Sequence, residues 1–209
     1  TAFLFLILAL AQPRFGTKLE MVTRRGVDII VALDTSLSMM AEDIPPNRLL
    51  RARLEIESLI DRLNGDRIGL VAFSGQSFVL CPLTLDYSAA KLFLDSIDTG
   101  LIATQGTAIA QAIRTATDAF GTEEQKYKAL VLITDGEDHA GEAMEAARHA
   151  AEAGVRIFAV GIGTQDGELI PVKKEGRIEF LKDRNGNVVK TRLDEATLVE
   201  MARETNGGY

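Results

Sequence analysis

Three oxygen-bearing side chains follow the first strand-like segment of the chain. Residues 27–33 form an almost entirely apolar run of the kind found in strands buried on both faces, and Asp34-Thr35-Ser36-Leu37-Ser38 comes directly after it. Asp34, Ser36 and Ser38 are spaced two residues apart where a strand opens into a loop, so their oxygens can face one point. Oxygen-only ligands suit a hard cation such as Mg²⁺. The pentapeptide therefore indicates a candidate cation site.

Two further segments place oxygens where a strand is expected to end or a helix to begin. Thr104-Gln105-Gly106-Thr107 puts a hydroxyl at a predicted helix start, and Thr134-Asp135-Gly136 puts a carboxylate after another apolar strand. Taken singly, these side chains have common structural explanations, since Ser and Thr often cap helices and Asp before Gly is frequent in turns. Their joint position at one edge of one sheet favours a metal site.

The elements that must position these residues alternate between strand and helix along the chain. This alternation predicts an α/β fold, a doubly wound and mostly parallel sheet with helices on both faces. Such sheets bind ligands beyond the carboxyl ends of their strands. We expect buried strands at 27–33, 129–134 and 155–160, another strand at 68–73, an antiparallel edge strand at 77–80, and helices at 47–63, 86–97, 107–120, 142–153 and 193–204.

One stretch, residues 169–192, breaks this alternation. It contains short segments at 177–181 and 188–190 around Asp183-Arg184-Asn185-Gly186, and Asn-Gly is a preferred sequence for a tight hairpin turn. We therefore predict a peripheral β-hairpin insertion formed by 177–181 and 188–190. The sequence contains no internal repeat, low-complexity tract or second domain.

The first residues differ in composition from the remainder. Residues 2–11 are uninterrupted apolar, and the chain starts with Thr1 rather than Met. About 20 apolar residues are needed to cross a bilayer, so we expect residues 1–12 to be the C-terminal part of a transmembrane helix, followed by a juxtamembrane linker at 13–26. The core of a signal peptide and a buried helix are the alternatives.

The overall composition restricts the classes of function. With 209 residues, 46% apolar and 25% charged, the chain can bury one sizeable core. The net charge of −7 argues against a nucleic-acid partner, because no basic stripe is available to neutralise phosphates. Cys81 is the single cysteine, which excludes a disulfide within this chain, and we expect it to be a small buried apolar residue.

The discontinuous set formed by the pentapeptide, Thr107 and Asp135 resembles the metal-ion-dependent adhesion site of von Willebrand factor A (VWA) domains. All five oxygen-bearing positions match, and the resemblance covers about residues 26–209. It implies that Ser36, Ser38 and Thr107 are direct metal ligands. It also implies that Asp34 and Asp135 bind the metal largely through water. Around the metal, the residues expected to contact a partner are Leu37, Gln105, Gly106, Gly136 and Glu137.

The same resemblance implies how such a site works. The expected metal is Mg²⁺, with Mn²⁺ or Ca²⁺ as alternatives, and one metal position stays open. An acidic side chain of a protein partner would fill that position. The domain is expected at 27–209, and the last strand and helix of an A domain are absent from it, which would leave a sheet edge exposed.

A narrower resemblance is to the bacterial BatA/BatB proteins. It implies an inner-membrane protein whose VWA domain faces the periplasm and works with other Bat proteins and a MoxR-type AAA+ ATPase in aerotolerance and oxidative stress. One departure is Leu37, which stands where that family commonly has Gly and makes the loop stiffer. The motifs that carry the resemblance are Gln12-Pro13-Arg14-Phe15-Gly16, Arg25-Gly26-Val27-Asp28-Ile29, Cys81-Pro82-Leu83-Thr84-Leu85-Asp86-Tyr87 and Thr134-Asp135-Gly136-Glu137-Asp138-His139.

An enzyme on the same sheet edge is the alternative hypothesis. A metal-dependent phosphohydrolase that forms an aspartyl-phosphate needs a second carboxylate two residues after its nucleophile, but Ser36 occupies that position. No suitably placed lysine follows Asp135, and the sequence lacks P-loop, nucleophile-elbow and HExxH motifs. We therefore favour a binding module without catalytic residues. His139, near the metal loop, is expected to be a solvated loop histidine.

Overall fold

Strand β1 (Asp28–Asp34) lies at the centre of a five-stranded sheet in a computed structural model that describes residues 26–121, 127–137, 142–174 and 177–209. The other strands are β2 (Arg67–Phe73), β3 (Ser77–Thr84), β4 (Lys128–Thr134) and β5 (Val155–Gly161), and the strand order is β3-β2-β1-β4-β5. All neighbouring strands pair in parallel except β2 and β3, which are antiparallel. The predicted mostly parallel sheet with one antiparallel edge strand is confirmed.

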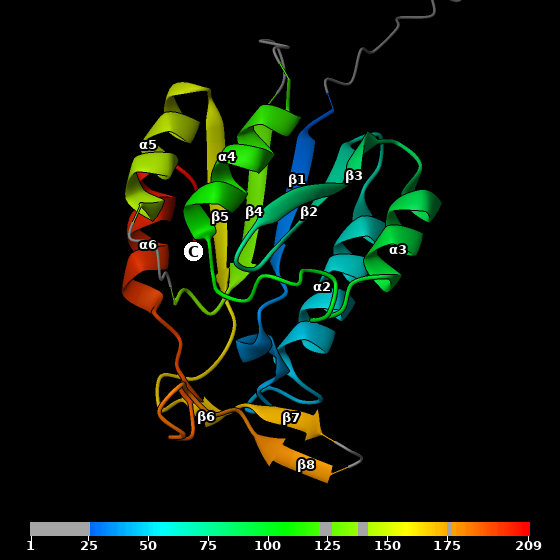
Figure 1. Cartoon of the computed structure of the whole chain (residues 1–209). Helices are drawn as coiled ribbons and strands as arrows, with labels where there is room; N and C mark the ends of the chain where they lie inside the picture. Colours follow the sequence, from blue (N-terminus) through cyan, green and yellow to red (C-terminus); the bar gives the residue numbers. More distant parts are fainter. Residues whose placement is uncertain (1–25, 122–126, 138–141, 175–176) are drawn as a thin grey trace, which may run out of the picture.

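Two layers of helices cover the sheet (Figure 1). One layer consists of α4 (Ile109–Ala119), α5 (Ala143–Glu152) and α6 (Glu195–Glu204). The other consists of α2 (Arg48–Arg62) and α3 (Tyr87–Asp95). Successive side chains of a strand point to opposite faces, so the almost continuous apolar sequence of β1 supplies both layers of the core.

The central strands β1, β2 and β4 bury side chains on both faces of the sheet, whereas β5 buries them on one face only. In β5, Ile157 and Ala159 pack into the core with α5 and α6, but Phe158 and Val160 are 40% and 45% exposed. The prediction that β5 is a buried strand was therefore wrong on one face, because no β5 side chain belongs to the apolar cluster under α2 and α3. The backbone of Gly208 forms a parallel bridge with Phe158.

Side-chain caps begin three of the helices. Asn47 accepts a hydrogen bond from the backbone N–H of Leu50, Asp86 accepts one from Ala89, and Asp194 accepts one from the N–H of Thr197. Each contact satisfies a backbone N–H in the first turn that has no partner within the helix. Helix α4 begins two residues later than predicted, and Thr107 therefore lies in the preceding loop rather than in the helix.

The insertion after β5 forms two small antiparallel sheets at the carboxyl end of the main sheet (Figure 1). Strand β6 (Glu168–Leu169) pairs with β9 (Lys190–Thr191), and β7 (Pro171–Lys174) pairs with β8 (Arg177–Phe180). The predicted peripheral hairpin around the Asn-Gly turn is present, with a bridge between Lys182 and Val188 and backbone hydrogen bonds from Val189 N–H to the Leu181 carbonyl and from Asp183 N–H to the Asn187 carbonyl, both at 2.8 Å. Residues 177–180, expected to pair with 188–190, pair with β7 instead. Proline and two lysines in β7 concealed its strand character in the sequence.

Cys81 is buried in the apolar cluster beneath α2 and α3, where burial raises the pKa of its thiol. Within the described ranges, no helix combines the length and apolar character needed to cross a bilayer. The expected transmembrane segment at 1–12, the linker up to residue 25 and His139 lie outside the described residues.

Candidate metal site at the carboxyl end of the sheet

The predicted site residues lie where the strand order reverses. Strand β1 has β2 on one side and β4 on the other, so the chain moves in opposite directions across the sheet from this point. Asp34 is the last residue of β1, Thr134 is the last residue of β4, and Asp135 follows it. The two carboxylates predicted for the site are therefore placed by neighbouring parallel strands.

Asp34 is fully buried, and both of its carboxylate oxygens accept hydrogen bonds. The backbone N–H of Ser36 donates to Oδ1 at 2.8 Å, and the hydroxyl of Thr134 donates to Oδ2 at 2.7 Å. The first contact turns the chain sharply after β1. As a result, the hydroxyl oxygens of Ser36 and Ser38 lie 2.9 Å from each other. The expected convergence of these two hydroxyls is present in the structure.

The turn after β2, at residues 74–76, is hydrogen-bonded to the loop at 104–107. Gly75 donates its N–H to the carbonyl of Thr104 at 2.9 Å, and Ala108 donates to the carbonyl of Ser74 at 2.7 Å. The Ser74 hydroxyl donates to the carbonyl of Gly106 at 3.0 Å. A Cβ on Gly75 would lie 2.7 Å from a side-chain carbon of Thr104, so the close approach requires glycine. This turn holds the loop that carries Thr107 beside the end of β1.

The three loops enclose a pocket of about 150 Å³. Of the predicted ligands, Ser36, Ser38 and Thr107 line it, while Asp34 and Asp135 are buried at the strand ends. Four of the five expected partner-contact residues line it as well. The insertion contributes a further, apolar wall that the sequence did not predict. The full lining is Ser36, Leu37, Ser38, Gln105, Gly106, Thr107, Glu137, Ile170, Leu181 and Val189.

Gly136 does not line the pocket. Its φ is +80°, and a Cβ at this position would lie 2.5 Å from the carbonyl oxygen of Asp194. The backbone N–H of Asp194 donates to the carbonyl of Asp135 at 2.8 Å. Glycine at 136 therefore lets the loop after β4 pack against the start of α6.

The electrostatics of the site favour a cation. Burial is the largest effect that raises the pKa of Asp34, and the neighbouring charge of Asp135 adds to it. Hydrogen bonds from Thr134 and Ser36 oppose these effects but do not cancel them, and the pKa rises to about 7. A divalent cation would offset the repulsion between the two carboxylates. Because the described residues contain no group of three or more His, Cys, Asp or Glu side chains with metal-binding geometry, hydroxyls must complete the donor set.

Sequence reasoning missed two buried residues that contact Asp135. Arg48, at the start of α2, donates from Nη1 to Asp135 Oδ2 at 3.0 Å. The hydroxyl of Thr191, in β9, donates to the same oxygen at 3.0 Å. For Arg48 a signal existed, since it precedes the inward-facing residues Ala52 and Ile56 at intervals of four. Nothing in the sequence around Thr191 distinguishes it from an ordinary strand threonine.

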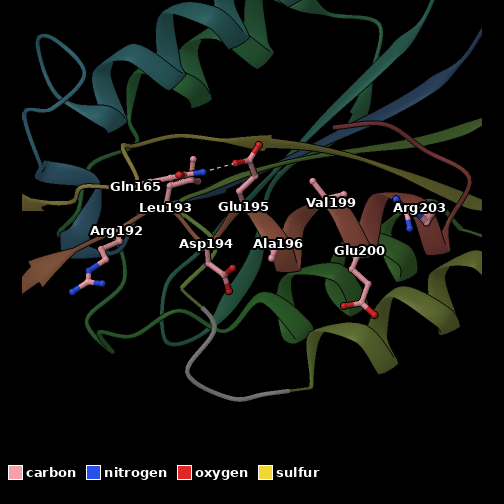
Figure 2. A pocket seen from close by; sticks show the side chains of 9 residues that line it. All are labelled: Gln165, Arg192, Leu193, Asp194, Glu195, Ala196, Val199, Glu200 and Arg203. Atoms are coloured by element: carbon pink, nitrogen blue, oxygen red, sulfur yellow. Dashed lines mark hydrogen bonds between the residues drawn. The ribbon is translucent and has the colours of Figure 1, made fainter.

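A larger hollow of about 840 Å³ lies elsewhere, along the exposed side of α6. Figure 2 shows its lining, which includes Gln165, Glu195 and Glu200 and none of the predicted metal ligands. The amide of Gln165 donates to Glu195 at 2.7 Å across one end. This hollow is wide, open and lined by side chains of both charges, and it is separate from the candidate metal site.

Comparison with known proteins identifies the fold family. The family model of the von Willebrand factor type A domain matches residues 28–177. The chain belongs to the VWA domain family. This assignment agrees with the five-stranded sheet and its order, and it confirms the resemblance seen in the sequence.

Solved structures give the narrower relationship. The BatB protein of Bacteroides thetaiotaomicron is 46% identical, with a TM-score of 0.84 over 88% of this chain and 89% of that one. An aerotolerance-related membrane protein of Bacteroides fragilis is 44% identical, with a TM-score of 0.84 over 88% and 90% of the two chains. This VWA domain is therefore of the BatB type. Proximal thread matrix protein 1 of the mussel byssus, solved with a zinc-occupied metal-ion-dependent adhesion site, shares the fold at 19% identity, with a TM-score of 0.62 over 88% of this chain and 40% of that one.

Longer relatives are known from sequence. A UPF0353 protein of Nocardia farcinica is 28% identical over 98% of this chain and 63% of its own length. An uncharacterised protein of Borreliella burgdorferi is 30% identical over 99% of this chain and 60% of its own length. The chain thus spans about three fifths of the length of these relatives.

Proposed function

We propose that this VWA domain binds a protein partner through a divalent cation held at the carboxyl end of the sheet. Ser36, Ser38 and Thr107 would hold the ion directly, and the two buried carboxylates would hold it through water. The ion, Mg²⁺ with Mn²⁺ or Ca²⁺ as alternatives, supplies a positive charge able to take a carboxylate oxygen from the partner. The observation that carries the proposal is the convergence of three separate loops on one pocket of about 150 Å³.

The hydrogen bonds of Asp34 favour binding over phosphoryl transfer. A nucleophilic carboxylate needs a free oxygen that the substrate can reach. Asp34 is fully buried, and its two oxygens are already engaged by the Ser36 N–H and the Thr134 hydroxyl. Its position suits a residue that orients the loop and balances the charge of a cation. The metal-dependent phosphohydrolase is therefore the second hypothesis.

The cellular setting is part of the proposal and rests on the relatives. The similarity to BatB and to an aerotolerance-related membrane protein supports a membrane-anchored protein of a Bat-type complex. We place the domain on the periplasmic side of the bacterial inner membrane, with a MoxR-type AAA+ ATPase among the proteins that act with it. The zinc-occupied site of the mussel protein makes Zn²⁺ a competitor to include in metal assays.

The test separates metal binding from partner binding. Calorimetric titration with Mg²⁺, Mn²⁺, Ca²⁺ and Zn²⁺ would measure the first, and pull-down of other Bat proteins in Mg²⁺ or EDTA would measure the second. The double variant Ser36→Ala/Ser38→Ala should lose both, whereas Ser88→Ala, an exposed serine of α3, should lose neither. Partner capture that survives EDTA and the double substitution contradicts the proposal. Phosphatase turnover that disappears in Asp34→Ala would favour the enzyme.

A further inference from the structure

Arg48 is a charged residue with no exposed side-chain surface. It is the first residue of α2, where the positive end of the helix dipole disfavours a cation. Removal of a guanidinium from water is costly unless its charge is balanced and its donors are used. Its position therefore does not stabilise α2 by itself, and its partners must account for it.

Two carboxylates balance this guanidinium. Asp43 takes a bidentate pair, with Nε to Oδ1 at 2.8 Å and Nη2 to Oδ2 at 2.7 Å. The remaining arm, Nη1, reaches Asp135 Oδ2 at 3.0 Å. A planar guanidinium held at both ends has a fixed orientation. Arg48, which does not line the pocket, therefore fixes the direction of the Asp135 carboxylate through Oδ2.

The insertion joins the same cluster through Thr191. This buried residue of β9 donates its hydroxyl to Asp135 Oδ2 at 3.0 Å, and its oxygen accepts a hydrogen bond from Arg48 Nη1 at 3.1 Å. Asp43 is tied to the segment after β5, because it accepts hydrogen bonds from the N–H and the hydroxyl of Thr164 at 2.8 and 3.0 Å. Both ends of the insertion thus connect to the guanidinium cluster.

The insertion also forms one wall of the metal pocket. Ile170, Leu181 and Val189 line the pocket together with the hydroxyls of Ser36, Ser38 and Thr107. The Leu181 N–H donates to the Ile170 carbonyl at 2.9 Å, and the Val189 N–H donates to the Leu181 carbonyl at 2.8 Å, so the three wall residues form one hydrogen-bonded unit. Thr191 follows Val189 by two residues, so a displacement of Thr191 should shift the position of this wall.

We propose that Arg48 and Thr191 couple the metal site to the insertion, so that a bound cation and a docked pocket wall stabilise each other. The proposal rests on the metal-binding half of the proposed function. Oxygen Oδ2 of Asp135 is occupied by Arg48 and Thr191, which leaves Oδ1, with one long contact of 3.3 Å from the Glu137 N–H, to face a cation. A cation on Oδ1 would hold the Asp135 carboxylate in the orientation in which Oδ2 meets both Arg48 and Thr191. By linkage, the docked insertion must raise cation affinity by the same factor.

The coupling gives Arg48 and Thr191 positioning roles without contact to the partner. It also makes the apolar wall a part of the binding surface that is in place when the metal is bound. A partner would then meet a carboxylate-accepting ion beside Ile170, Leu181 and Val189. The fitting ligand is an acidic side chain flanked by an apolar one.

The experiment measures both directions of the coupling in the whole chain. The variants are Thr191→Val, which removes the hydroxyl at nearly constant volume, and Thr191→Ser, which keeps it. Mn²⁺ affinity would be measured by calorimetry, and amide hydrogen exchange of peptides covering 168–170 and 189–193 would be measured in EDTA and in saturating Mn²⁺. We expect Thr191→Val to weaken Mn²⁺ binding about tenfold and Thr191→Ser to bind within about twofold of the wild type. Mn²⁺ should slow exchange of both peptides in the wild type and much less in Thr191→Val.

Arg48 is tested in parallel against Arg51, which is on the same helix and pairs at the surface with Glu55. Arg48→Met should reduce Mn²⁺ affinity and the exchange response together, while Arg51→Met should change neither. Thr191→Val gives the answer if Arg48→Met fails to fold. Unchanged Mn²⁺ affinity in Thr191→Val, or exchange of the insertion that does not respond to Mn²⁺ in the wild type, overturns the coupling. A wild type that binds none of the four cations overturns the proposed function itself, and coupled metal binding without metal-dependent partner capture overturns only its partner half.

Discussion

Thr134 donates its hydroxyl proton to Asp34 Oδ2 at 2.7 Å, so the residue that ends β4 holds the carboxylate that ends β1. The same hydroxyl oxygen accepts the N–H of Gly136 at 3.1 Å. Thr134 therefore connects the two carboxylate-bearing loops of the site, although it is not expected to contact the metal. Its side chain is fully buried, and water cannot replace these bonds at little cost.

Thr134→Val should destabilise the metal-free protein by about 2–4 kcal/mol, because a buried carboxylate loses a donor and a backbone N–H loses its acceptor. Urea denaturation in EDTA measures the free energy of unfolding. Thr134→Ser is the control, since it keeps the hydroxyl and removes only a methyl group, at a cost of about 1 kcal/mol. Equal stabilities of the two variants would show that the hydroxyl does not hold Asp34. Mg²⁺ affinity should fall only in the valine variant.

Asp34→Asn should have opposite effects on stability and on metal binding. Burial and the charge of Asp135 penalise ionised Asp34 in the metal-free protein, as its raised pKa indicates. A neutral amide of the same shape removes that penalty, although its NH2 group cannot accept one of the two hydrogen bonds from Ser36 and Thr134. Because those bonds do not cancel the penalty on the ionised form, the melting temperature in EDTA above pH 7 should rise. Saturating Mg²⁺ should raise the melting temperature of the wild type and leave Asp34→Asn unchanged. A variant that melts lower than the wild type in EDTA contradicts this prediction, and Asp118→Asn, an exposed residue of α4, is the matched control.

The sequence predicted the parts of the fold that periodicity determines. The strands of the main sheet and the helices that cover it were found because their apolar residues follow the patterns of buried strands and amphipathic helices. Whether a second helical layer covers β5 depends on packing between distant segments, so the exposure of Phe158 was not predictable from its own apolar strand. For a similar reason the insertion was predicted only in part: the hairpin around the Asn-Gly turn was found, but the pairing of 177–180 with β7 was not. Its strands are only two to four residues long and carry too little pattern to fix a register.

The candidate site likewise contains residues that were predictable from the sequence and residues that were not. The three hydroxyls and two carboxylates were found because strand ends in a parallel sheet share one edge, which topology alone dictates. Arg48 and Thr191 reach Asp135 from 87 residues before and 56 residues after it, and no local spacing encodes such contacts. A basic residue on an inward helical stripe is the signal that could have indicated Arg48.

The Arg48–Asp43 pair should make stability depend on pH in acid. Burial alone would raise the pKa of Asp43, but hydrogen bonds and charge from Arg48, with donors from Thr164, outweigh it and lower the pKa from its ordinary value of 3.8 to about 2. The folded pKa lies below the unfolded one, so the stabilisation is present above about pH 4 and is lost as the pH falls towards 2. The side chain of Asp43 is only 5% exposed, which limits screening by solvent.

The shift corresponds to about 2 kcal/mol, of which about half is lost at pH 3. The measurement is the difference in unfolding free energy between the wild type and Asp43→Asn, from urea denaturation in EDTA at pH 6, 5, 4 and 3. This difference should be constant down to about pH 5 and shrink below it. A difference that stays the same at pH 3 would show that Asp43 has an ordinary pKa.

Gly163→Ala should disturb the metal site from a distance, because this glycine makes room for Arg48. Its φ is +134°, and a Cβ there would lie 2.7 Å from Arg48 Cζ. The guanidinium cannot move aside easily, because Asp43, Asp135 and Thr191 already hold it by hydrogen bonds. Backbone strain and overpacking together should cost about 2–4 kcal/mol, and Mn²⁺ affinity should fall with the displaced guanidinium. Gly154→Ala is the control, since its φ is +75° and no atom lies within 4 Å of the added carbon, so it should cost about 1 kcal/mol and leave Mn²⁺ affinity unchanged. Urea denaturation measures the loss of stability, and calorimetry measures the Mn²⁺ affinity. Equal Mn²⁺ affinity in the two variants would show that the position of Arg48 does not influence the site.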